Sequence, residues 1–284
     1  MTQSMDEVSE IGSRVLKFYR QLPFNVTGNV ETMAAEIKSF DSLSEYPPLT
    51  RILGPRTHTL DVGCGGGWLS NSIAYHCKAP VVGIDFNPVA IEFARSVAEH
   101  LGTGARFEQA DLFRFVPERP FDAVISLGVL HHTADCLGAI RHLCRHAVRQ
   151  GGFLFIGLYH LYGRRPFLEH FARMKINGAS EVTMLHEFTR LIGDQTMDQT
   201  HLMSWFRDQV QHPHETSHTL AELAGILAAE GFELLATSID NYAQIVSLDE
   251  VLVSENTLES VGRQRLAEGR YYPGFFCVLA RHRS

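Results

Sequence analysis

Short apolar runs alternate with segments of helical character through the middle of the chain. The runs predict five buried strands, at residues 57–62, 81–85, 105–110, 121–126 and 150–158. Residues 68–76 and 88–100 are the predicted helices between the first three runs. Strands that alternate with helices form right-handed βαβ units, so the pattern predicts an α/β fold with a doubly wound, mostly parallel sheet.

The same alternation resumes towards the carboxyl terminus. Thr219 and Glu222 form a capping-box pattern in front of an apolar helical face, and Gly231 stands where that helix should end. Two further strands are predicted, at residues 232–237 and 272–280. We therefore expect residues 219–284 to complete the core that residues 57–159 begin.

Two regions fall outside this core, and both have helical character. Residues 1–56 form the predicted amino-terminal helical segment. Residues 160–218 separate the fifth strand from the capped helix and are far too many for an ordinary loop. We interpret them as a helical lid, whose apolar positions either wall a substrate pocket or pack only for stability.

A glycine-dense turn with Gly63, Cys64, Gly65 and Gly67 follows the first predicted strand, which has Asp61 near its end. Glycines there let the backbone approach a bound ligand, and the helix behind them presents free N–H groups. Trp68 stands where the dinucleotide-binding motif needs its third glycine or alanine, which argues against NAD and FAD. Asp85 lies 22 residues beyond Gly63 at the end of the second strand, where a carboxylate can accept ribose hydroxyls.

The order Asp61-x-Gly63-x-Gly65-x-Gly67 resembles the first motif of class I S-adenosylmethionine (SAM)-dependent methyltransferases. Matches follow in the family's order at Asp85, at Asp111, in the loop 127–133 and at the turn Gln150-Gly151-Gly152. The resemblance covers residues 57–159 and is nearest to the small-molecule branch that includes enzymes of the ubiquinone and menaquinone pathways. It implies SAM as the cofactor and a Rossmann-like sheet of seven strands, the last of them antiparallel.

The resemblance also implies roles at the carboxyl edge of the sheet. In the family, the acid at the position of Asp111 binds the adenine amino group, and the neighbouring backbone, here that of Leu112, reads a ring nitrogen. Phe86 is expected to lie against the adenine. Tyr19 and Phe24 belong to an amino-terminal segment that either covers the bound cofactor or only packs. The expected cofactor contacts are Tyr19, Asp61, Gly63, Cys64, Gly65, Gly67, Asp85, Phe86, Asp111, Leu112 and Leu127.

Three histidines are candidates for chemistry on the acceptor. His131 and His132 lie in the loop that faces the reacting methyl group in this fold, so one of them is expected to act as general base or substrate ligand. His214 and Glu215 belong to a histidine-rich segment, residues 212–218, which we expect to reach the pocket from the lid. Its spacing fits no catalytic zinc pattern, so no metal is predicted. A purely structural role is the alternative for each residue.

Polar residues also follow the fifth strand at the same edge. Tyr159, His160 and Arg164 are expected to bind substrate together with Glu215. Arg164 and its neighbour Arg165 have the chemistry to clamp a carboxylate or phosphate, and a solvated pair is the alternative.

Composition narrows the function. The chain of 284 residues carries a formal net charge of −7, which opposes a polyanionic partner, so no nucleic acid is expected. Five cysteines form no C-x-x-C pair, no apolar run is long enough for a membrane span, and residues 1–12 lack the apolar part of a secretory signal. We expect a cytoplasmic enzyme that methylates a small molecule. A tRNA or protein methyltransferase and a SAM-binding protein without turnover are the alternatives, and the acceptor and oligomeric state stay open.

Overall fold

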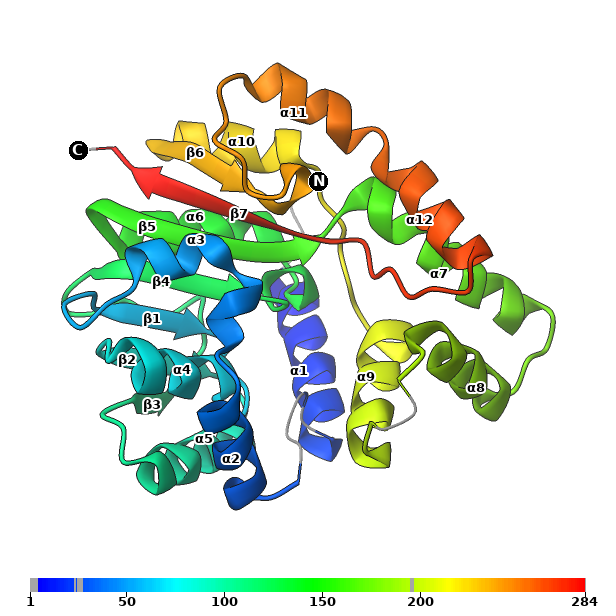
Figure 1. Cartoon of the computed structure of the whole chain (residues 1–284), viewed down its shortest axis with the longest axis horizontal. Coiled ribbons are helices and arrows are strands. Elements are labelled where there is room, and N and C mark those ends of the chain that lie inside the picture. The colour runs from blue at the N-terminus through cyan, green and yellow to red at the C-terminus, as the bar shows by residue number, and fades with distance from the viewer. Residues whose placement is uncertain (1–4, 23, 25–27, 195–196, 284) are drawn as a thin grey trace.

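The computed structural model describes residues 5–22, 24, 28–194 and 197–283. Residues 1–4, part of the stretch assessed above for a secretory signal, lie outside the described residues. The centre of the molecule is a seven-stranded sheet with the order β3-β2-β1-β4-β5-β7-β6 (Figure 1). The strands are β1 Thr59–Val62, β2 Val81–Asp85, β3 Arg106–Gln109, β4 Phe121–Leu127, β5 Val148–Tyr159, β6 Phe232–Thr237 and β7 Phe275–His282.

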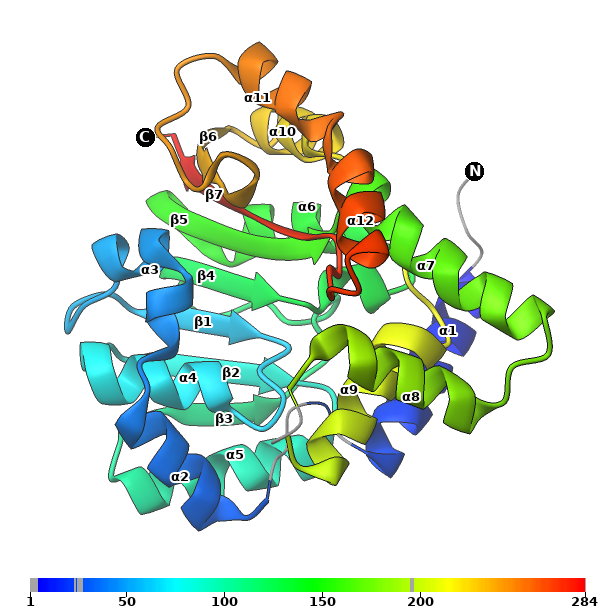
Figure 2. The ribbon, with the colours of Figure 1, turned by 45° about the vertical axis from the view of Figure 1, so that its right-hand side comes forward.

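The directions of the strands agree with the predicted class. Strands β1 to β5 form parallel pairs, whereas β7 is antiparallel to both β5 and β6. The α/β class, the mostly parallel sheet and its antiparallel last strand are therefore confirmed. The carboxyl ends of the parallel strands all lie at one edge, which is where ligands bind in such sheets. In Figure 2 this edge faces the helices α1 and α9.

Helices cover both faces of the sheet. One layer includes α3 Pro47–Ile52 and α4 Trp68–Ser72, which continues as a π-helical turn over Ile73–Cys77, and the other includes α6 Cys136–His146 and α10 Leu220–Ala229. Successive residues of β5 alternate between the layers, as the two-residue period of a strand requires. Leu154 and Ile156 pack with α6 and α10, while Phe155 packs with α3 and α4. Beside β3, α5 Pro88–Leu101 packs against α2 Val30–Ser39.

Residues 160–218 fold into three helices, α7 Leu161–Ile176, α8 Glu181–Ile192 and α9 Gln199–Gln211. This lid has an apolar cluster of its own, which contains Phe167, Phe171, Phe188, Leu191 and Phe206. The sequence pattern predicted no element between β6 and β7, but the structure has α11 Leu248–Glu255 and α12 Leu258–Ala267 there. Because α12 packs along α7 (Figure 2), the carboxyl-terminal part of the chain both completes the sheet and supports the lid.

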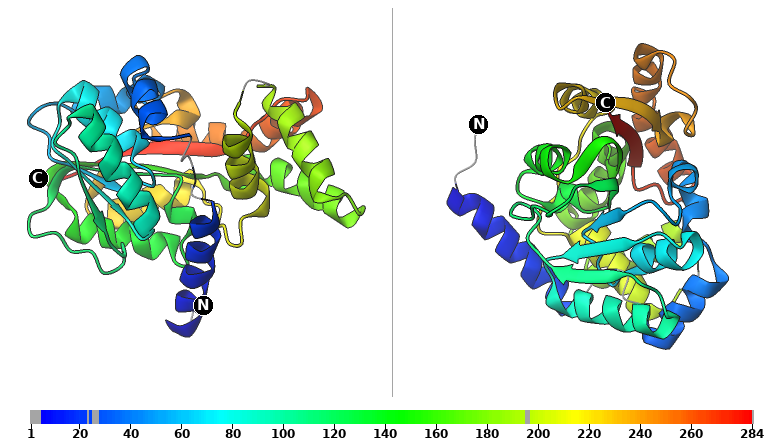
Figure 3. Two further views of the ribbon diagram at one scale, coloured as in Figure 1. Left: turned by 90° about the horizontal axis from the view of Figure 1, so that it is seen from below. Right: turned by 90° about the vertical axis from the view of Figure 1, so that its left-hand side faces the viewer.

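The amino-terminal helix α1, Met5–Gln21, stands beside α9 rather than on a face of the sheet (Figure 3). Arg207 of α9 donates to the Phe18 carbonyl at 3.3 Å and to Gln21 Oε1 at 3.1 Å, and its guanidinium lies 4.5 Å from the centre of the Phe18 ring. These contacts join α1 to the lid. Within the described ranges, no helix combines the length and apolar character that a membrane crossing requires.

Gly157 in β5 tests how closely the sheet packs under its covering layer. A Cβ at this position would overlap the Phe275 ring and lie 2.8 Å from Leu127 Cδ2. We expect Gly157→Ala to lower the free energy of unfolding by about 1–3 kcal/mol, because an overpacked site forces its neighbours to move. Urea unfolding measures the change.

Gly225→Ala in α10 is the matched control for this substitution. Nothing lies within 4 Å of a Cβ at that exposed position. Because alanine favours the helix over glycine, the control should be as stable as the wild type or about 1 kcal/mol more stable. Equal stability of Gly157→Ala and the wild type would contradict the packing described here.

Candidate active site

The glycine turn joins the end of β1 to the start of α4. Gly63 and Gly67 have φ angles of +74° and +79°, in the left-handed region that favours glycine. A Cβ on Gly63 would lie 2.9 Å from Val129 Cβ, and one on Gly67 would lie 2.7 Å from Ala94 Cβ. Both the conformation and the close packing therefore require glycine at these two positions.

Asp85 ends β2 directly beside this turn. Its Oδ2 accepts a hydrogen bond from the Gly65 N–H at 2.9 Å, and its Oδ1 accepts one from the Asn87 N–H at 2.8 Å. Burial raises the pKa of Asp85, while these backbone donors favour the carboxylate. Each oxygen keeps a second lone pair for another donor. The structure thus brings Asp85 and the glycine turn together at the carboxyl edge.

Asp61 faces inward from β1 and supports the turn from below. The Ser70 hydroxyl of α4 donates to Asp61 Oδ2 at 2.5 Å, and the carboxyl group is buried. Burial raises the pKa of Asp61 to about 6, and the nearby Asp85 acts in the same direction. This hydrogen bond connects β1 to α4, and a direct contact of Asp61 with a cofactor stays a prediction.

Three other expected cofactor residues pack their side chains against apolar clusters. The Cys64 side chain is buried with Ile91 and Phe107, and burial raises the pKa of its thiol. The side chain is therefore directed into this cluster, and the backbone of Cys64 borders the turn. Leu112 and Leu127 are half-buried and pack against clusters on opposite faces of the sheet. A cofactor would meet Cys64 through its backbone atoms.

Phe86 and Asp111 lie at the ends of neighbouring strands. The Ala110 N–H donates to the Asp85 carbonyl at 2.9 Å, which places Asp111 next to the end of β2. The Asp111 side chain is 54% exposed, and its Oδ1 accepts the Phe113 N–H. Phe86 is half-buried. These two residues and Asp85 therefore form one region of the edge.

Tyr19 of α1 lies over the end of β2. Asn87 Nδ2 donates to the Tyr19 carbonyl at 3.4 Å, and the Tyr19 hydroxyl donates to Asp208 Oδ1 in α9 at 2.6 Å. Burial, followed by the charge of Asp208, raises the pKa of Tyr19 well above its usual value. The Phe24 carbonyl oxygen lies 3.9 Å from where a Cβ on Gly65 would stand. The amino-terminal segment therefore passes beside the glycine turn and connects it to the lid.

His131 lies in the short 3₁₀ turn η3, Leu130–His132, just after β4, and its side chain is buried among rings. Its ring centre is 4.1 Å from that of Tyr159 and 4.2 Å from that of His132. Neither ring nitrogen has a hydrogen-bond partner among the described residues. Burial lowers the pKa of His131 well below its usual value, so the ring is neutral at pH 7. One N–H donor and one lone pair therefore stay unused.

His132 is oriented by the segment that follows α9. Its Nδ1 lies 3.0 Å from the His214 carbonyl oxygen, and because a carbonyl only accepts, Nδ1 carries the proton and Nε2 the lone pair. Nε2 lies 3.8 Å from Asp208 Oδ1, and the centre of the His212 ring lies 3.7 Å from that of the His132 ring, with the planes tilted by 31°. Burial lowers the pKa of His132 to about 3.

His214 attaches residues 212–218 to the η3 turn. Its Nε2 lies 3.1 Å from the Thr133 carbonyl oxygen. Next to it, the Thr216 N–H and hydroxyl donate to the His131 carbonyl at 2.8 and 3.2 Å. The His214 imidazole is thus used to hold the turn that carries the other two candidate histidines.

The guanidinium of Arg164 is fully buried in the first turn of α7. It donates to Glu215 Oε1 and Oε2 at 3.0 and 2.8 Å and to the Gln209 carbonyl at 2.8 Å, and it lies 3.9 Å above the Tyr159 ring. Arg165 points elsewhere and pairs with Glu259 of α12. The structure therefore replaces the expected clamp of two arginines with an ion pair between Arg164 and Glu215, which fastens residues 212–218 to the lid.

Tyr159 and His160 lie at the junction of β5 and α7. The Tyr159 hydroxyl accepts a hydrogen bond from Gln209 Nε2 at 2.5 Å, and its ring lies against His131. His160 caps α7, because its Nδ1 accepts the Tyr162 N–H at 3.2 Å, and its Nε2 donates to Glu255 Oε1 at 2.7 Å. Both nitrogens of His160 are used by the protein, so the structure gives this residue a supporting role where the sequence predicted a substrate contact.

Asp208 and Gln209 are parts of this site that sequence reasoning missed, and His212 was considered only as a member of the histidine-rich segment 212–218. Gln209 Nε2 donates to Asp208 Oδ2 at 2.9 Å, and the Tyr271 hydroxyl donates to Gln209 Oε1 at 2.9 Å. One signal was present in the sequence: Asp208 and His212 are four residues apart, which puts them on one face of a helix end.

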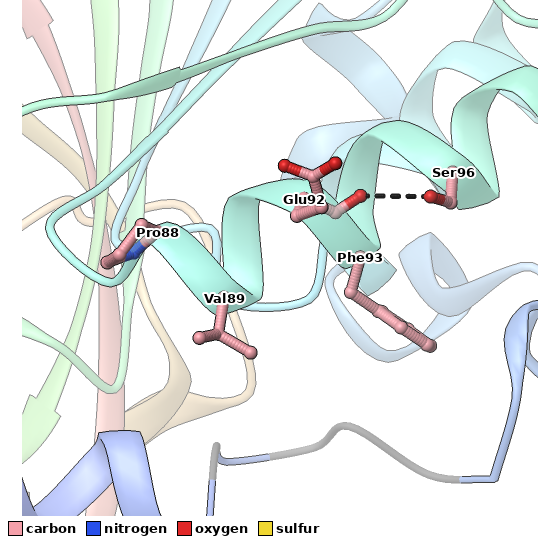
Figure 4. A pocket seen from close by; sticks show the side chains of 5 residues that line it. All are labelled: Pro88, Val89, Glu92, Phe93 and Ser96. Carbon is pink, nitrogen blue, oxygen red and sulfur yellow. Dashed lines mark hydrogen bonds between the residues drawn. The ribbon is translucent and has the colours of Figure 1, made fainter.

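A shallow apolar groove on α5 is separate from this site. It is lined by Pro88, Val89, Glu92, Phe93 and Ser96 (Figure 4). Ile91 and Ala94 of the same helix lie on its other face and pack into the core. None of the residues that line the groove belongs to the polar groups described above.

Comparison with known proteins identifies the family. The sequence model of the family described as Methyltransferase domain matches residues 53–208, more than half of the chain. The chain belongs to this family. The ubiquinone biosynthesis O-methyltransferase of Pseudomonas paraeruginosa is 30% identical to this methyltransferase domain protein over 201 residues, which cover 61% of this chain and 81% of that protein. The protein of the same name from Aliivibrio fischeri is 31% identical over 153 residues, and the match covers 46% of this chain but only 64% of that relative.

Solved structures share the fold of this methyltransferase domain. PKMT2 from Rickettsia typhi, in complex with AdoHcy, has a TM-score of 0.60 at 15% identity, over 84% of this chain and 53% of that chain. Magnesium protoporphyrin IX methyltransferase (ChlM) from Synechocystis, with bound SAH, has a TM-score of 0.53 at 17% identity, over 97% of this chain and 99% of that chain. At 15–17% identity these likenesses show the fold alone, and the expected membership of a methyltransferase family is confirmed by the family model.

The pKa of Asp61 makes stability depend on pH. Because burial raises this pKa to about 6, the folded chain holds the proton more tightly than the unfolded chain does. The contribution of Asp61 is therefore complete at low pH and is lost as the pH rises through about 6. Between pH 4 and pH 7, we expect the wild type to lose about 2 kcal/mol of unfolding free energy relative to Asp61→Asn, which does not titrate.

Urea unfolding of both proteins across this pH range measures the difference. Other titrating groups are common to the two chains, so their contributions cancel except at Asp85 and Cys64, whose charges interact with that of Asp61. Parallel stability curves for the wild type and Asp61→Asn would show that Asp61 does not have a raised pKa.

Proposed function

We propose that this protein uses SAM and transfers its methyl group to a small-molecule acceptor. The observation that carries the proposal is the buried Asp85 carboxylate, which the Gly65 N–H joins to the glycine turn at 2.9 Å. Membership of the methyltransferase family supports the reaction, and relatives named as O-methyltransferases support the class of acceptor.

The residues at the ends of β1, β2 and β3 fit an adenosyl group. Both oxygens of Asp85 have lone pairs left for the ribose hydroxyls. The exposed carboxylate of Asp111 suits the adenine amino group, and the half-buried ring of Phe86 offers an apolar surface beside it. Bound SAM supplies a methyl group on a positively charged sulfur. The glycine turn lets the backbone come close to the cofactor, and Tyr19 covers it from the amino-terminal side.

We assign His131 to the acceptor. Neither of its ring nitrogens is used by the described protein groups, so the lone pair can accept a hydrogen bond from an acceptor hydroxyl and take its proton as methylation makes that oxygen positively charged. The Tyr159 ring packs against this ring, with the two centres 4.1 Å apart and the planes tilted by 40°. His132 and His214 keep the η3 turn in place, and the lid excludes water from the reacting atoms.

Three features favour a small acceptor handled inside the cell. The net charge of −7 disfavours nucleic acid. The polar groups next to His131 are enclosed between the sheet edge and the lid. The five cysteines are all free, which suits a reducing compartment such as the cytoplasm.

Asp85→Ala tests the cofactor site. The substitution removes charge-assisted hydrogen bonds, and the loss of even one, worth about 1.5–3 kcal/mol, weakens SAM binding by at least about 10-fold to 100-fold. Isothermal titration calorimetry with SAM measures the affinity. Glu118→Gln, which removes an exposed carboxylate outside the site, should bind as the wild type does. Equal affinities of Asp85→Ala and the wild type would overturn the assignment of this site.

His131→Gln tests the acceptor side separately. With acceptors that the wild type methylates, drawn from small phenols and hydroxy acids, we expect release of S-adenosylhomocysteine to fall by about 10²-fold to 10⁴-fold. The affinity for SAM should not change, because the ring does not belong to the proposed cofactor site. His146→Gln on the exposed end of α6 is the control and should keep full activity. Unchanged turnover in His131→Gln would remove this residue from the mechanism.

A further inference from the structure

Three groups of the type that bind metals meet beside His131. They are His132 of the η3 turn, Asp208 of α9 and His212, which follows α9. One ligand atom from each lies within 4.8 Å of the other two. His132 and Asp208 are each only 4% exposed. The cluster therefore comes from separate parts of the chain, with His132 and Asp208 buried and His212 half-buried.

The orientation and the tautomer of the His132 ring suit a metal ligand. Its Nδ1–H is bonded to the His214 carbonyl, so the lone pair is on Nε2, which is buried and has no hydrogen-bond partner among the described residues. A backbone carbonyl on the other ring nitrogen is the usual way in which a metal-binding histidine is oriented. The Nε2 atom lies 3.8 Å from Asp208 Oδ1, too far for a hydrogen bond. Two ligands that each bind one metal ion at about 2.0–2.2 Å are separated by a distance of this order.

Asp208 brings a buried carboxyl group to the cluster. Its oxygens accept hydrogen bonds from the Tyr19 hydroxyl at 2.6 Å and from Gln209 Nε2 at 2.9 Å. In the described part of the chain its one ion-pair contact is with His132, whose Nδ1 holds the ring proton and whose Nε2 faces Asp208 Oδ1 at 3.8 Å. An unpaired buried carboxylate is costly, and a bound cation removes this cost.

His212 is the third of these groups and the one expected to bind a metal ion most weakly. Its Nε2 is buried without a partner among the described residues. Its Nδ1, however, accepts the His214 N–H at 3.1 Å, so that the proton of the neutral ring is on Nε2. Binding a metal through Nε2 requires this proton to leave and the contact with His214 to change. His212 should therefore contribute less affinity than the other two groups.

We propose that His132, Asp208 and His212 form a binding site for one divalent transition-metal ion. Two imidazoles and one carboxylate are a ligand set that suits Zn²⁺ or Fe²⁺. Metal binding itself does not depend on the proposed methyl transfer. The role that we expect for the metal ion does rest on the proposed methyl transfer, because a cation beside His131 would bind the acceptor oxygen and favour its deprotonated form. Residues 212–218 supply one ligand, which is why their own spacing does not match a zinc motif.

Calorimetric titration of the chelator-treated full chain with Zn²⁺ tests the proposal. We expect one tight equivalent for the wild type. Loss of a group that only supports a ligand already costs about 10-fold to 100-fold in metal affinity, so His132→Ala and Asp208→Asn should each lose at least about 100-fold. His212→Ala should lose less. His146→Ala removes an exposed imidazole and is the matched control, which should bind as the wild type does.

The Co²⁺ absorption spectrum of the wild type provides a measurement that needs no variant. Bands typical of nitrogen and oxygen ligands at low coordination number would support the site, and the spectrum of hydrated Co²⁺ would overturn it. Absence of a tight equivalent in the wild type, or equal affinity in His132→Ala and Asp208→Asn, would also overturn it. SAM titration of the metal-free chain separates the metal site from the proposed methyl transfer. A chain that binds SAM but no metal ion would contradict the metal site alone.

Discussion

The buried guanidinium of Arg164 sets the geometry of the lid side of the site. An ionised group loses its hydration when it is buried, and only a complete set of acceptors offsets that loss. Glu215 accepts two of its hydrogen bonds, and Gln209 accepts others through its carbonyl and its side-chain oxygen. Because Glu215 belongs to residues 212–218, the same ion pair decides where His212 lies. The position of His212 in the site thus depends on the charge of Arg164, which Glu215 already pairs.

The sheet and the cofactor edge were predictable because their signals are local. The β-branched run at residues 81–85 predicted a strand, and β2 occupies Val81–Asp85. Glycine density predicted a tight turn, and Gly63 and Gly67 have the positive φ angles that such a turn requires. Thr219 forms the capping box that its spacing to Glu222 predicted. The antiparallel direction of the last strand came from the family resemblance and was not encoded in the pattern.

The lid side was not predictable, because its contacts join residues that are distant in the sequence. Tyr19 and Asp208 are 189 residues apart, and His160 and Glu255 are 95 apart. A sequence shows which side chains can donate or accept, but it does not show which protein groups will satisfy them. His160 therefore had the chemistry of a substrate ligand, although Glu255 and the first turn of α7 use both of its nitrogens.

The distribution of charge explains why the same edge of the sheet suits both SAM and a metal ion. Asp85 and Asp208 are buried carboxylates that both act on Tyr19, whereas the two histidines of the η3 turn are neutral. The positive charge of Arg164 is balanced by Glu215. A dinucleotide would bring phosphates into this negative field, whereas SAM brings a positive sulfur, and a metal ion brings two positive charges to Asp208. The two buried carboxyl groups therefore favour cationic ligands, in addition to the steric argument that Trp68 makes against a dinucleotide.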